Sequence, residues 1–182
     1  MPLWRCRRRP EIPVIEVTTT PKNRKHFSRL MSFAQEVLGI RDEVGITPVL
    51  SASLAVFAYT QDPAMEVHDV DLSCSESHFA RLRQVLEERG IDCGITIWHV
   101  LQARRTDLKV EFDATEYWMH DISEHVERAR IANIEFRIVG MDGLRELYRK
   151  GLVETADKVD DNSQIKHRAI REKLRSLDTF RT

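Results

Sequence analysis

His68-Asp69-Val70-Asp71-Leu72-Ser73 is the stretch that decides the fold of this chain. Acidic and apolar residues alternate in it, which predicts a β-strand with both carboxylates on one face and Val70 and Leu72 on the other. Two negative charges held this close repel each other, so the pKa of one carboxyl rises unless a cation shares the site. A metal ion is the commonest such cation, and the stretch therefore predicts a metal site.

A turn of small residues precedes this strand in the sequence. The apolar residues 48–50 predict a short strand that leads straight into Ser51-Ala52-Ser53. Residues 54–59 are almost entirely apolar and predict a buried helix that begins near Ser53.

A second acidic strand is predicted downstream, at residues 107–113. Strict alternation places Asp107, Lys109, Glu111 and Asp113 on one of its faces. Glu111 or Asp113 is positioned to supply a third metal ligand and to act as a general base. Alternation does not choose between these two, and we favour Glu111 slightly because apolar residues flank it on both sides.

These residue types suit the transfer of phosphate groups. Such reactions need oxygen ligands that hold Mg²⁺ against the phosphates, and backbone amides that bind the phosphates. Mg²⁺ prefers oxygen ligands and keeps several waters, so Asp69, Asp71 and Glu111 are sufficient as predicted metal ligands. Basic side chains must also offset the charge of a triphosphate. The candidates are Lys109, Lys150 and Lys158.

The rest of the chain predicts a mixed α/β (α+β) fold, with a mixed sheet flanked by helices and followed by a helical segment. Helical periodicity is expected at 26–38 and after Ser75, strands at 47–50, 69–73, 95–101, 108–112 and 134–139, a hairpin-like connection at 102–106, and helices from residue 141 onward. We divide the chain into a basic, proline-containing and poorly ordered leader at 1–23, an α/β core at 24–140 and a C-terminal helical segment at 141–182.

Composition excludes several classes of protein. The 182 residues are 42% hydrophobic and 31% charged, with a formal net charge of -1, so no global field favours a nucleic-acid duplex or an anionic membrane. The three cysteines share no Cys-x-x-Cys spacing, which predicts neither a zinc site nor a disulfide framework and makes the cytoplasm the default location. No apolar run approaches the roughly 20 residues that span a bilayer, so no membrane association is expected.

The order of these segments resembles the nucleotidyltransferase superfamily related to DNA polymerase beta, especially its small bacterial members. The resemblance covers about residues 46–113: an apolar strand, a small-residue turn opening a helix, an Asp-x-Asp strand and a later acidic residue between apolar ones. It implies that Ser51, Ala52 and Ser53 bind the phosphates of the nucleotide, with Ser53 as the phosphate-binding serine. Ala52 occupies the position where the family usually has glycine.

The resemblance implies a Mg²⁺- or Mn²⁺-dependent enzyme that moves a nucleoside monophosphate from an NTP to an acceptor hydroxyl. In it, Asp69 and Asp71 bridge the metal ions, and Glu111 or Asp113 helps to deprotonate the acceptor. A transfer RNA end, a protein or a small molecule fits as acceptor, and a small protein partner of the toxin–antitoxin kind is compatible. One alternative is a catalytically degenerate nucleotide-binding or interaction module of the same fold. A glycosyltransferase ranks lower, because its Asp-x-Asp motif normally follows a nucleotide-binding half of about 100 residues, whereas only about 45 residues expected to be ordered precede Asp69.

Overall fold

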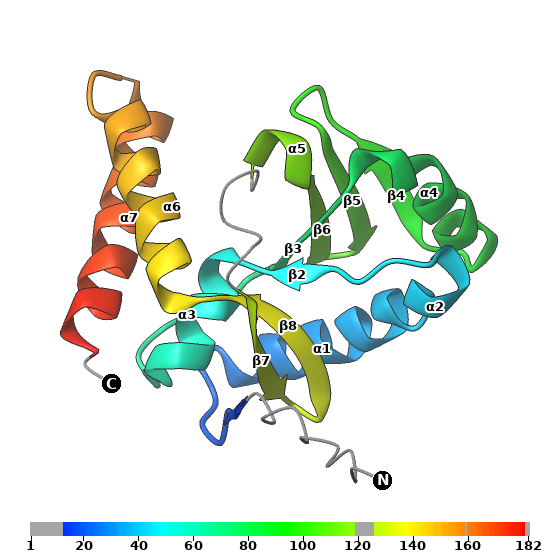
Figure 1. Cartoon of the computed structure of the whole chain (residues 1–182), viewed down its shortest axis with the longest axis horizontal. Helices are drawn as coiled ribbons and strands as arrows, with labels where there is room; N and C mark the ends of the chain where they lie inside the picture. Colours follow the sequence, from blue (N-terminus) through cyan, green and yellow to red (C-terminus); the bar gives the residue numbers. More distant parts are fainter. Residues whose placement is uncertain (1–12, 119–125, 159, 181–182) are drawn as a thin grey trace, which may run out of the picture.

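The computed structural model describes residues 13–118, 126–158 and 160–180. An eight-stranded mixed sheet forms its centre, in the order β1-β7-β8-β2-β3-β6-β5-β4 (Figure 1). The strands are β1 (Val14–Glu16), β2 (Val49–Leu50), β3 (Val70–Cys74), β4 (Asp92–Ile95), β5 (Val100–Arg105), β6 (Leu108–Ala114), β7 (Val126–Ile131) and β8 (Ile134–Val139). The expected mixed α/β class is therefore confirmed.

The helices alternate with these strands in the first half of the chain and follow them in the second. They are α1 (Arg24–Leu38), α2 (Arg41–Val44), α3 (Ala52–Thr60), the 3₁₀ turn η1 (Glu76–His78), α4 (Phe79–Glu88), α5 (Thr115–Trp118), α6 (Met141–Thr155) and α7 (Asp161–Thr179).

The two faces of the central strands differ in polarity. On β6 the residues Leu108, Val110 and Phe112 are buried, whereas the alternate residues between them are partly exposed. Helix α1 contacts β6, and α4 contacts β4 and β5, so these helices cover the apolar face. The opposite face, which bears the acidic side chains, is left accessible, and the period-two pattern of the sequence is the cause.

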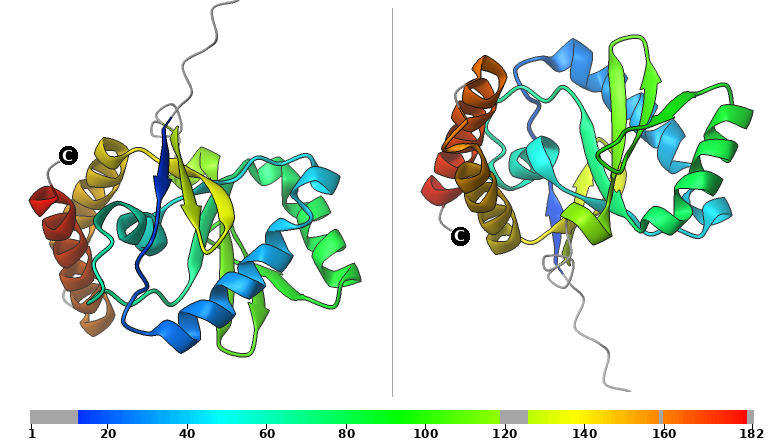
Figure 2. Two further views of the ribbon diagram at one scale, coloured as in Figure 1. Left: turned by 90° about the horizontal axis from the view of Figure 1, so that it is seen from below. Right: turned by 90° about the horizontal axis from the view of Figure 1, so that it is seen from above.

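The C-terminal helices α6 and α7 pack side by side at one end of the molecule, away from α4 (Figures 1 and 2). Both also contact α3, the helix that follows the small-residue turn. Ile170 and Leu177 of α7 are buried, which gives this helix an apolar contact stripe. The division into a core at 24–140 and a helical segment at 141–182 stays a prediction.

Two expectations about the strands are wrong. The strand expected at 95–101 is interrupted by a turn, in which Thr96 donates its backbone N–H to Val100 and His99 has a positive φ of 56°. The connection expected at 102–106 is mostly β5, and the chain reverses after Arg105. The sequence did not reveal this turn because the residues around it have high strand propensity. Strand propensity depends mainly on burial and packing and does not show where the chain reverses direction.

The edge of the sheet holds a strand that the sequence did not suggest. Val14–Glu16, inside the segment expected to be a poorly ordered leader, forms β1 and pairs in parallel with Arg128–Arg130 of β7. Arg130 also pairs with Glu16, at 2.7 Å. Residues 1–12 of that segment lie outside the described residues.

Candidate active site

Two adjacent parallel strands bring the acidic residues together. In the register of β3 and β6, Asp71 is the direct neighbour of Glu111, and Asp69 precedes it by two residues on the same face. One carboxylate oxygen from each of Asp69, Asp71 and Glu111 lies within 4.8 Å of the other two. The structure therefore gathers the three residues that the sequence suggested as metal ligands.

Lys109 lies among these carboxylates. Its Nζ is 2.9 Å from Glu111 Oε2 and 3.3 Å from Asp69 Oδ2. Gln102 of β5 donates a hydrogen bond to the other oxygen, Glu111 Oε1, at 2.5 Å. Burial lowers the pKa of Lys109, but the carboxylates of Glu111 and Asp69 outweigh it and raise the pKa overall.

Asp113 lies one step further along β6, where it is the neighbour of Ser73 rather than of the Asp-x-Asp pair. Burial and then the charge of Glu111 raise the pKa of Asp113 to about 6, although Lys109 opposes the shift. The register thus favours Glu111 as the third ligand. Asp113 has a pKa close to the range in which a carboxyl exchanges protons at neutral pH.

Of the carboxylates at this site, Asp71 has the least compensation of its negative charge by nearby cations and hydrogen-bond donors. Burial, followed by the charges of Asp69, Asp113 and Glu111, raises the pKa of Asp71 well above its usual value, and only Lys173 opposes this. Within the described part of the chain, no residue donates a hydrogen bond to its carboxylate.

The arrangement fits a divalent ion. Oxygens around one Mg²⁺ lie at about 2.1 Å from it and hence up to about 4.2 Å apart. A small movement of the side chains of Asp69, Asp71 and Glu111 would therefore bring one oxygen of each within binding distance of a single ion.

The N-terminus of α3 lies beside the acidic residues of β3. Ser51 donates its backbone N–H to the carbonyl oxygen of Asp71, at 2.9 Å, which fixes the turn against the strand. The Ser51 side chain does not cap the helix, so it leaves the first N–H groups of α3 without a side-chain partner. Free N–H groups at a helix N-terminus, together with the helix dipole, favour an anion such as phosphate.

Ala52 adopts the backbone conformation that glycine would provide. Its φ is 51°, in the left-handed region, although it is an alanine. A left-handed conformation costs a residue with a Cβ about 1–2 kcal/mol, and such strain persists only where the surroundings impose it. The turn therefore keeps the geometry of a glycine turn despite the substitution.

Replacing Ala52 with glycine should stabilise the protein. Relief of the strain outweighs the larger entropy loss of glycine, so we expect a net gain of about 0.5–1 kcal/mol, or about 1–4 °C in Tm. Ala58→Gly is the matched control, because Ala58 is buried within the same helix and should lose about 1 kcal/mol or more. A lower Tm for Ala52→Gly in thermal unfolding would show that the turn is not strained.

Lys173 of α7 reaches this turn and was missed at the level of the sequence. Its Nζ donates a hydrogen bond to Ser53 Oγ at 2.5 Å, across 120 positions of sequence, and lies 5.8 Å from the centre of the Tyr148 ring. Burial lowers the pKa of Lys173, whereas Asp71 and Asp69 act to raise it. The Lys173 side chain therefore lies at the α3 N-terminus, near enough to Asp71 and Asp69 for their charges to act on its pKa, which is lowered overall.

The other basic candidates lie elsewhere. Lys150 forms an ion pair of 3.3 Å with Glu146 on α6, and Lys158 is exposed beyond the end of that helix. A signal for Lys173 was present in the sequence: Ile170, Lys173, Leu174 and Leu177 share one helical stripe, and a lysine inside an apolar stripe is unusual.

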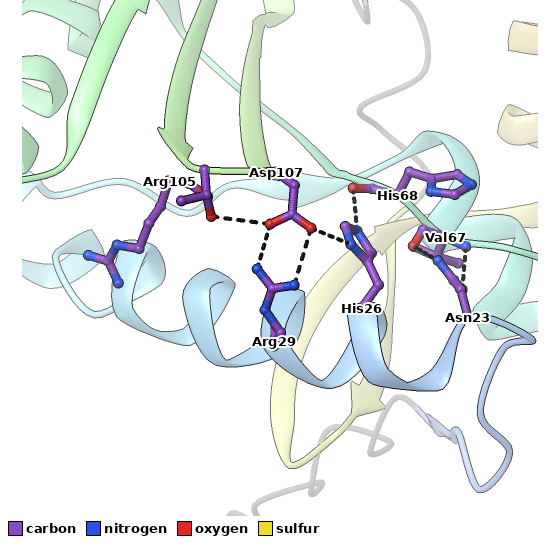
Figure 3. Close-up of polar contacts among 8 residues, drawn as sticks. Asn23, His26, Arg29, Val67, His68, Arg105 and Asp107 are labelled. Atoms are coloured by element: carbon purple, nitrogen blue, oxygen red, sulfur yellow. Dashed lines mark hydrogen bonds and ion pairs between the residues drawn. The ribbon is translucent and has the colours of Figure 1, made fainter.

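Helix α1 fixes the segments that lead into both acidic strands (Figure 3). His26 contacts the His68 carbonyl through Nε2, at 3.0 Å, and the Asp107 carboxylate through Nδ1, at 3.3 Å. Arg29 donates to both oxygens of Asp107. His68, just before Asp69, and Asp107, just before the start of β6, are thus held on one helix, which sets the spacing of the two strands.

Removing the carboxylate of Asp107 should cost stability in a pH-dependent way. Hydrogen bonding from Arg29 lowers the pKa of Asp107 to about 2, compared with about 3.9 in an unfolded chain. A depressed pKa contributes stability above the unfolded pKa and loses it as the pH falls towards the folded value. We therefore expect Asp107→Asn to lower the urea midpoint at pH 7, and by less at pH 3.

The control for this experiment is Asp42→Asn, since the Asp42 side chain is 97% exposed and its nearest cation is 4.0 Å away. If Asp107→Asn lowers the urea midpoint as much at pH 3 as at pH 7, the stabilising role given to the Arg29–Asp107 ion pair is contradicted.

The fold is that of nucleotidyltransferases, as solved structures show. The lincosamide antibiotic adenylyltransferase LnuA, solved with lincomycin bound, is 10% identical, with a TM-score of 0.54 over 82% of this chain and 97% of its own. The antibiotic-resistance factor ANT(2'')-Ia is 15% identical, with a TM-score of 0.55 over 84% and 90%. An antigenic nucleotidyltransferase-like protein from Paracoccidioides brasiliensis is 12% identical, with a TM-score of 0.55 over 86% and 77%.

Sequence comparison adds no further relatives: no protein-family model matches the chain, and no curated protein matches it significantly. At these identities the structural similarity shows the fold alone. A search for membrane spans found no helix, among the residues that the structure describes, with the length and hydropathy to cross a bilayer.

Proposed function

We propose that this chain is a metal-dependent nucleotidyltransferase that moves a nucleoside monophosphate from an NTP to an acceptor hydroxyl. The observation that carries the proposal is the gathering of Asp69, Asp71 and Glu111 on adjacent strands, beside the uncapped N-terminus of α3. The shared fold with adenylyltransferases supports it.

In this proposal the parts of the site have separate roles, except that Glu111 is both a metal ligand and a candidate general base. Asp69, Asp71 and Glu111 would hold Mg²⁺ or Mn²⁺, which supplies charge neutralisation at the phosphates when bound. The turn Ser51-Ala52-Ser53 and Lys173 would bind the phosphate chain of the NTP. The acceptor oxygen forms a bond to the α-phosphorus, the bond to the β-phosphate oxygen breaks, and pyrophosphate leaves.

The proton of the acceptor hydroxyl goes to a carboxylate, and the two candidates can be separated. Removing a general base costs about 100- to 10,000-fold in rate. Because Glu111 is the direct neighbour of Asp71, we expect Glu111→Gln to lose activity on this scale and Asp113→Asn to stay within about tenfold. The measurement is transfer of label from NTPs carrying radioactive α-phosphate. The opposite ranking would assign the base to Asp113.

The acceptor class is suggested by a cavity of about 440 Å³ at the Ser73 end of the acidic face. Its described lining carries hydroxyl groups, the His78 imidazole and the Glu116 carboxylate, but no lysine or arginine. A phosphate-rich acceptor would need such cations. We therefore favour a small neutral or cationic molecule with hydroxyl groups over an RNA end. ANT(2'')-Ia, a protein of this fold, has been solved with adenylyl-2''-tobramycin.

The experiment that tests the function offers labelled NTPs, with Mg²⁺ or Mn²⁺, to three acceptor classes: hydroxylated small molecules, transfer RNA and protein. Label on a small molecule supports both the activity and the acceptor class, whereas label on RNA or protein supports the activity and overturns the acceptor. No label on any of the three contradicts the activity.

A second candidate is a catalytically inactive nucleotide-binding module. The observation that favours it is Lys109, which compensates Asp69 and Glu111 without a metal. Calorimetry with ATP and Mg²⁺, combined with the three acceptor classes above, distinguishes the two, because the module binds the nucleotide but transfers no label to any acceptor. A cytoplasmic location and a small protein partner of the toxin–antitoxin kind stay predictions.

A further inference from the structure

The position of Lys109 bears on how many metal ions the acidic face can hold. Its Nζ contacts Asp69 Oδ2 and Glu111 Oε2, and Gln102 donates to Glu111 Oε1. Both oxygens of Glu111 and one of Asp69 therefore already have a donor. The oxygens without a donor from the described residues are Asp69 Oδ1 and the pair on Asp71. Glu111 can join them by exchanging its contact with Lys109 or Gln102 for the ion, and together they supply about the protein share of one Mg²⁺ shell.

The balance of charges on the acidic face also indicates a single divalent ion. Asp69, Asp71, Glu111 and Asp113 are four acidic groups on one face, and the cations beside them are Lys109 and Lys173. Full ionisation leaves a formal surplus of two negative charges, which one divalent ion balances. A second divalent ion close to Lys109 would meet a positive charge in a partly buried site, where such repulsion is screened weakly.

We propose that Lys109 is a built-in cation that takes the place of a second divalent ion, so that the acidic face binds a single ion. The inference rests on the proposed function for the identity of the site. It concerns metal stoichiometry, which is measured without nucleotide, acceptor or turnover.

The test is Mn²⁺ binding to the full chain, followed by electron paramagnetic resonance of the free ion. Wild type should bind one Mn²⁺ per chain. Lys109→Met should bind two, or bind the first about tenfold more tightly, because the competing ammonium group is gone. Lys109→Arg keeps the charge and should retain the single ion of the wild type.

The matched control is Lys22→Met. Lys22 forms an ion pair of 3.3 Å with Glu66, a carboxylate outside the acidic face, so its removal should leave Mn²⁺ binding unchanged. A thermal-unfolding scan adds a second readout: metal-free Lys109→Met should melt below wild type, and Mn²⁺ should raise its Tm by more than that of wild type.

Two outcomes overturn the inference. One is wild type binding two Mn²⁺ ions, and the other is Lys109→Met binding a single ion with the affinity of wild type. Neither outcome decides whether the protein is a transferase, since an enzyme that binds two ions, with Lys109 uninvolved, would still transfer label. Conversely, a chain that binds one ion but transfers no label would contradict the proposed function and keep this inference.

Discussion

Asp71→Asn should abolish transfer of nucleoside monophosphate, with a loss of about 1,000-fold or more, while making the metal-free protein more stable. The activity falls because Asp71 is the central member of the acidic group and the proposed metal depends on it. A loss of this size corresponds to about 4 kcal/mol of transition-state stabilisation. Label transfer from NTP measures it.

The gain in stability follows from the sign of the pKa shift. The folded protein raises the pKa of Asp71, so above the unfolded pKa its ionisation opposes folding. Asparagine has no charge to bury, and each 1 kcal/mol gained should raise Tm by about 2–4 °C in a protein of this size. The gain should grow as the pH rises above the unfolded pKa of about 3.9, because the unfolded carboxyl ionises there while the folded protein opposes ionisation of Asp71.

The control is Asp42→Asn, which removes an exposed carboxylate of α2 and should change neither the rate of label transfer nor the Tm of the metal-free protein. Undiminished label transfer by Asp71→Asn would remove the proposed mechanism. A lower Tm without metal would show instead that the carboxylate is a stabilising group.

Lys173→Met should weaken nucleotide binding by about 10- to 100-fold, the effect of losing one charged hydrogen bond of about 1.5–3 kcal/mol. Lys173 is the ammonium group that contacts Ser53 in the first turn of α3. Since a contact to the phosphate chain exists before and during transfer, the loss should fall mainly on the KM for NTP rather than on kcat.

Lys166→Met is the control for this variant, because Lys166 lies on the same helix, is exposed, and should bind nucleotide as wild type does. Lys173→Arg should recover part of the affinity, as it keeps the charge. Calorimetry with ATP and Mg²⁺ provides the affinities, and circular dichroism checks that α7 is intact. An unchanged affinity in Lys173→Met would exclude the lysine from the phosphate site.

The acidic strands were predictable because their signal is local. Alternation alone places Asp69 and Asp71 on one face, and it does the same for Glu111 and Asp113. The preference for Glu111 as the third member of the group agrees with the register, in which it faces Asp71 directly. The roles of these residues in catalysis stay predictions.

Other features depend on contacts between distant segments, which alternation does not report. Strand β1 is three residues long at the edge of the sheet, and it exists because β7 offers it a partner more than 110 positions away. Lys173 similarly gains its place from the packing of α7 on α3. Lys150, Lys158 and Lys173 carry the same charge, so charge alone gave no reason to prefer Lys173.

The reach of Lys173 to Ser53 has a consequence for when the protein becomes competent during synthesis. Ribosomes make the chain from its N-terminus, so Asp69, Asp71, Glu111 and Asp113 emerge before α7, the helix that brings Lys173 to Ser53. A nascent chain that stops short of residue 173 would carry the acidic group yet lack the ammonium group beside it. Under the proposed function, nucleotide binding would reach its full affinity only after α7 has docked on α3, which is later than the synthesis of the acidic strands.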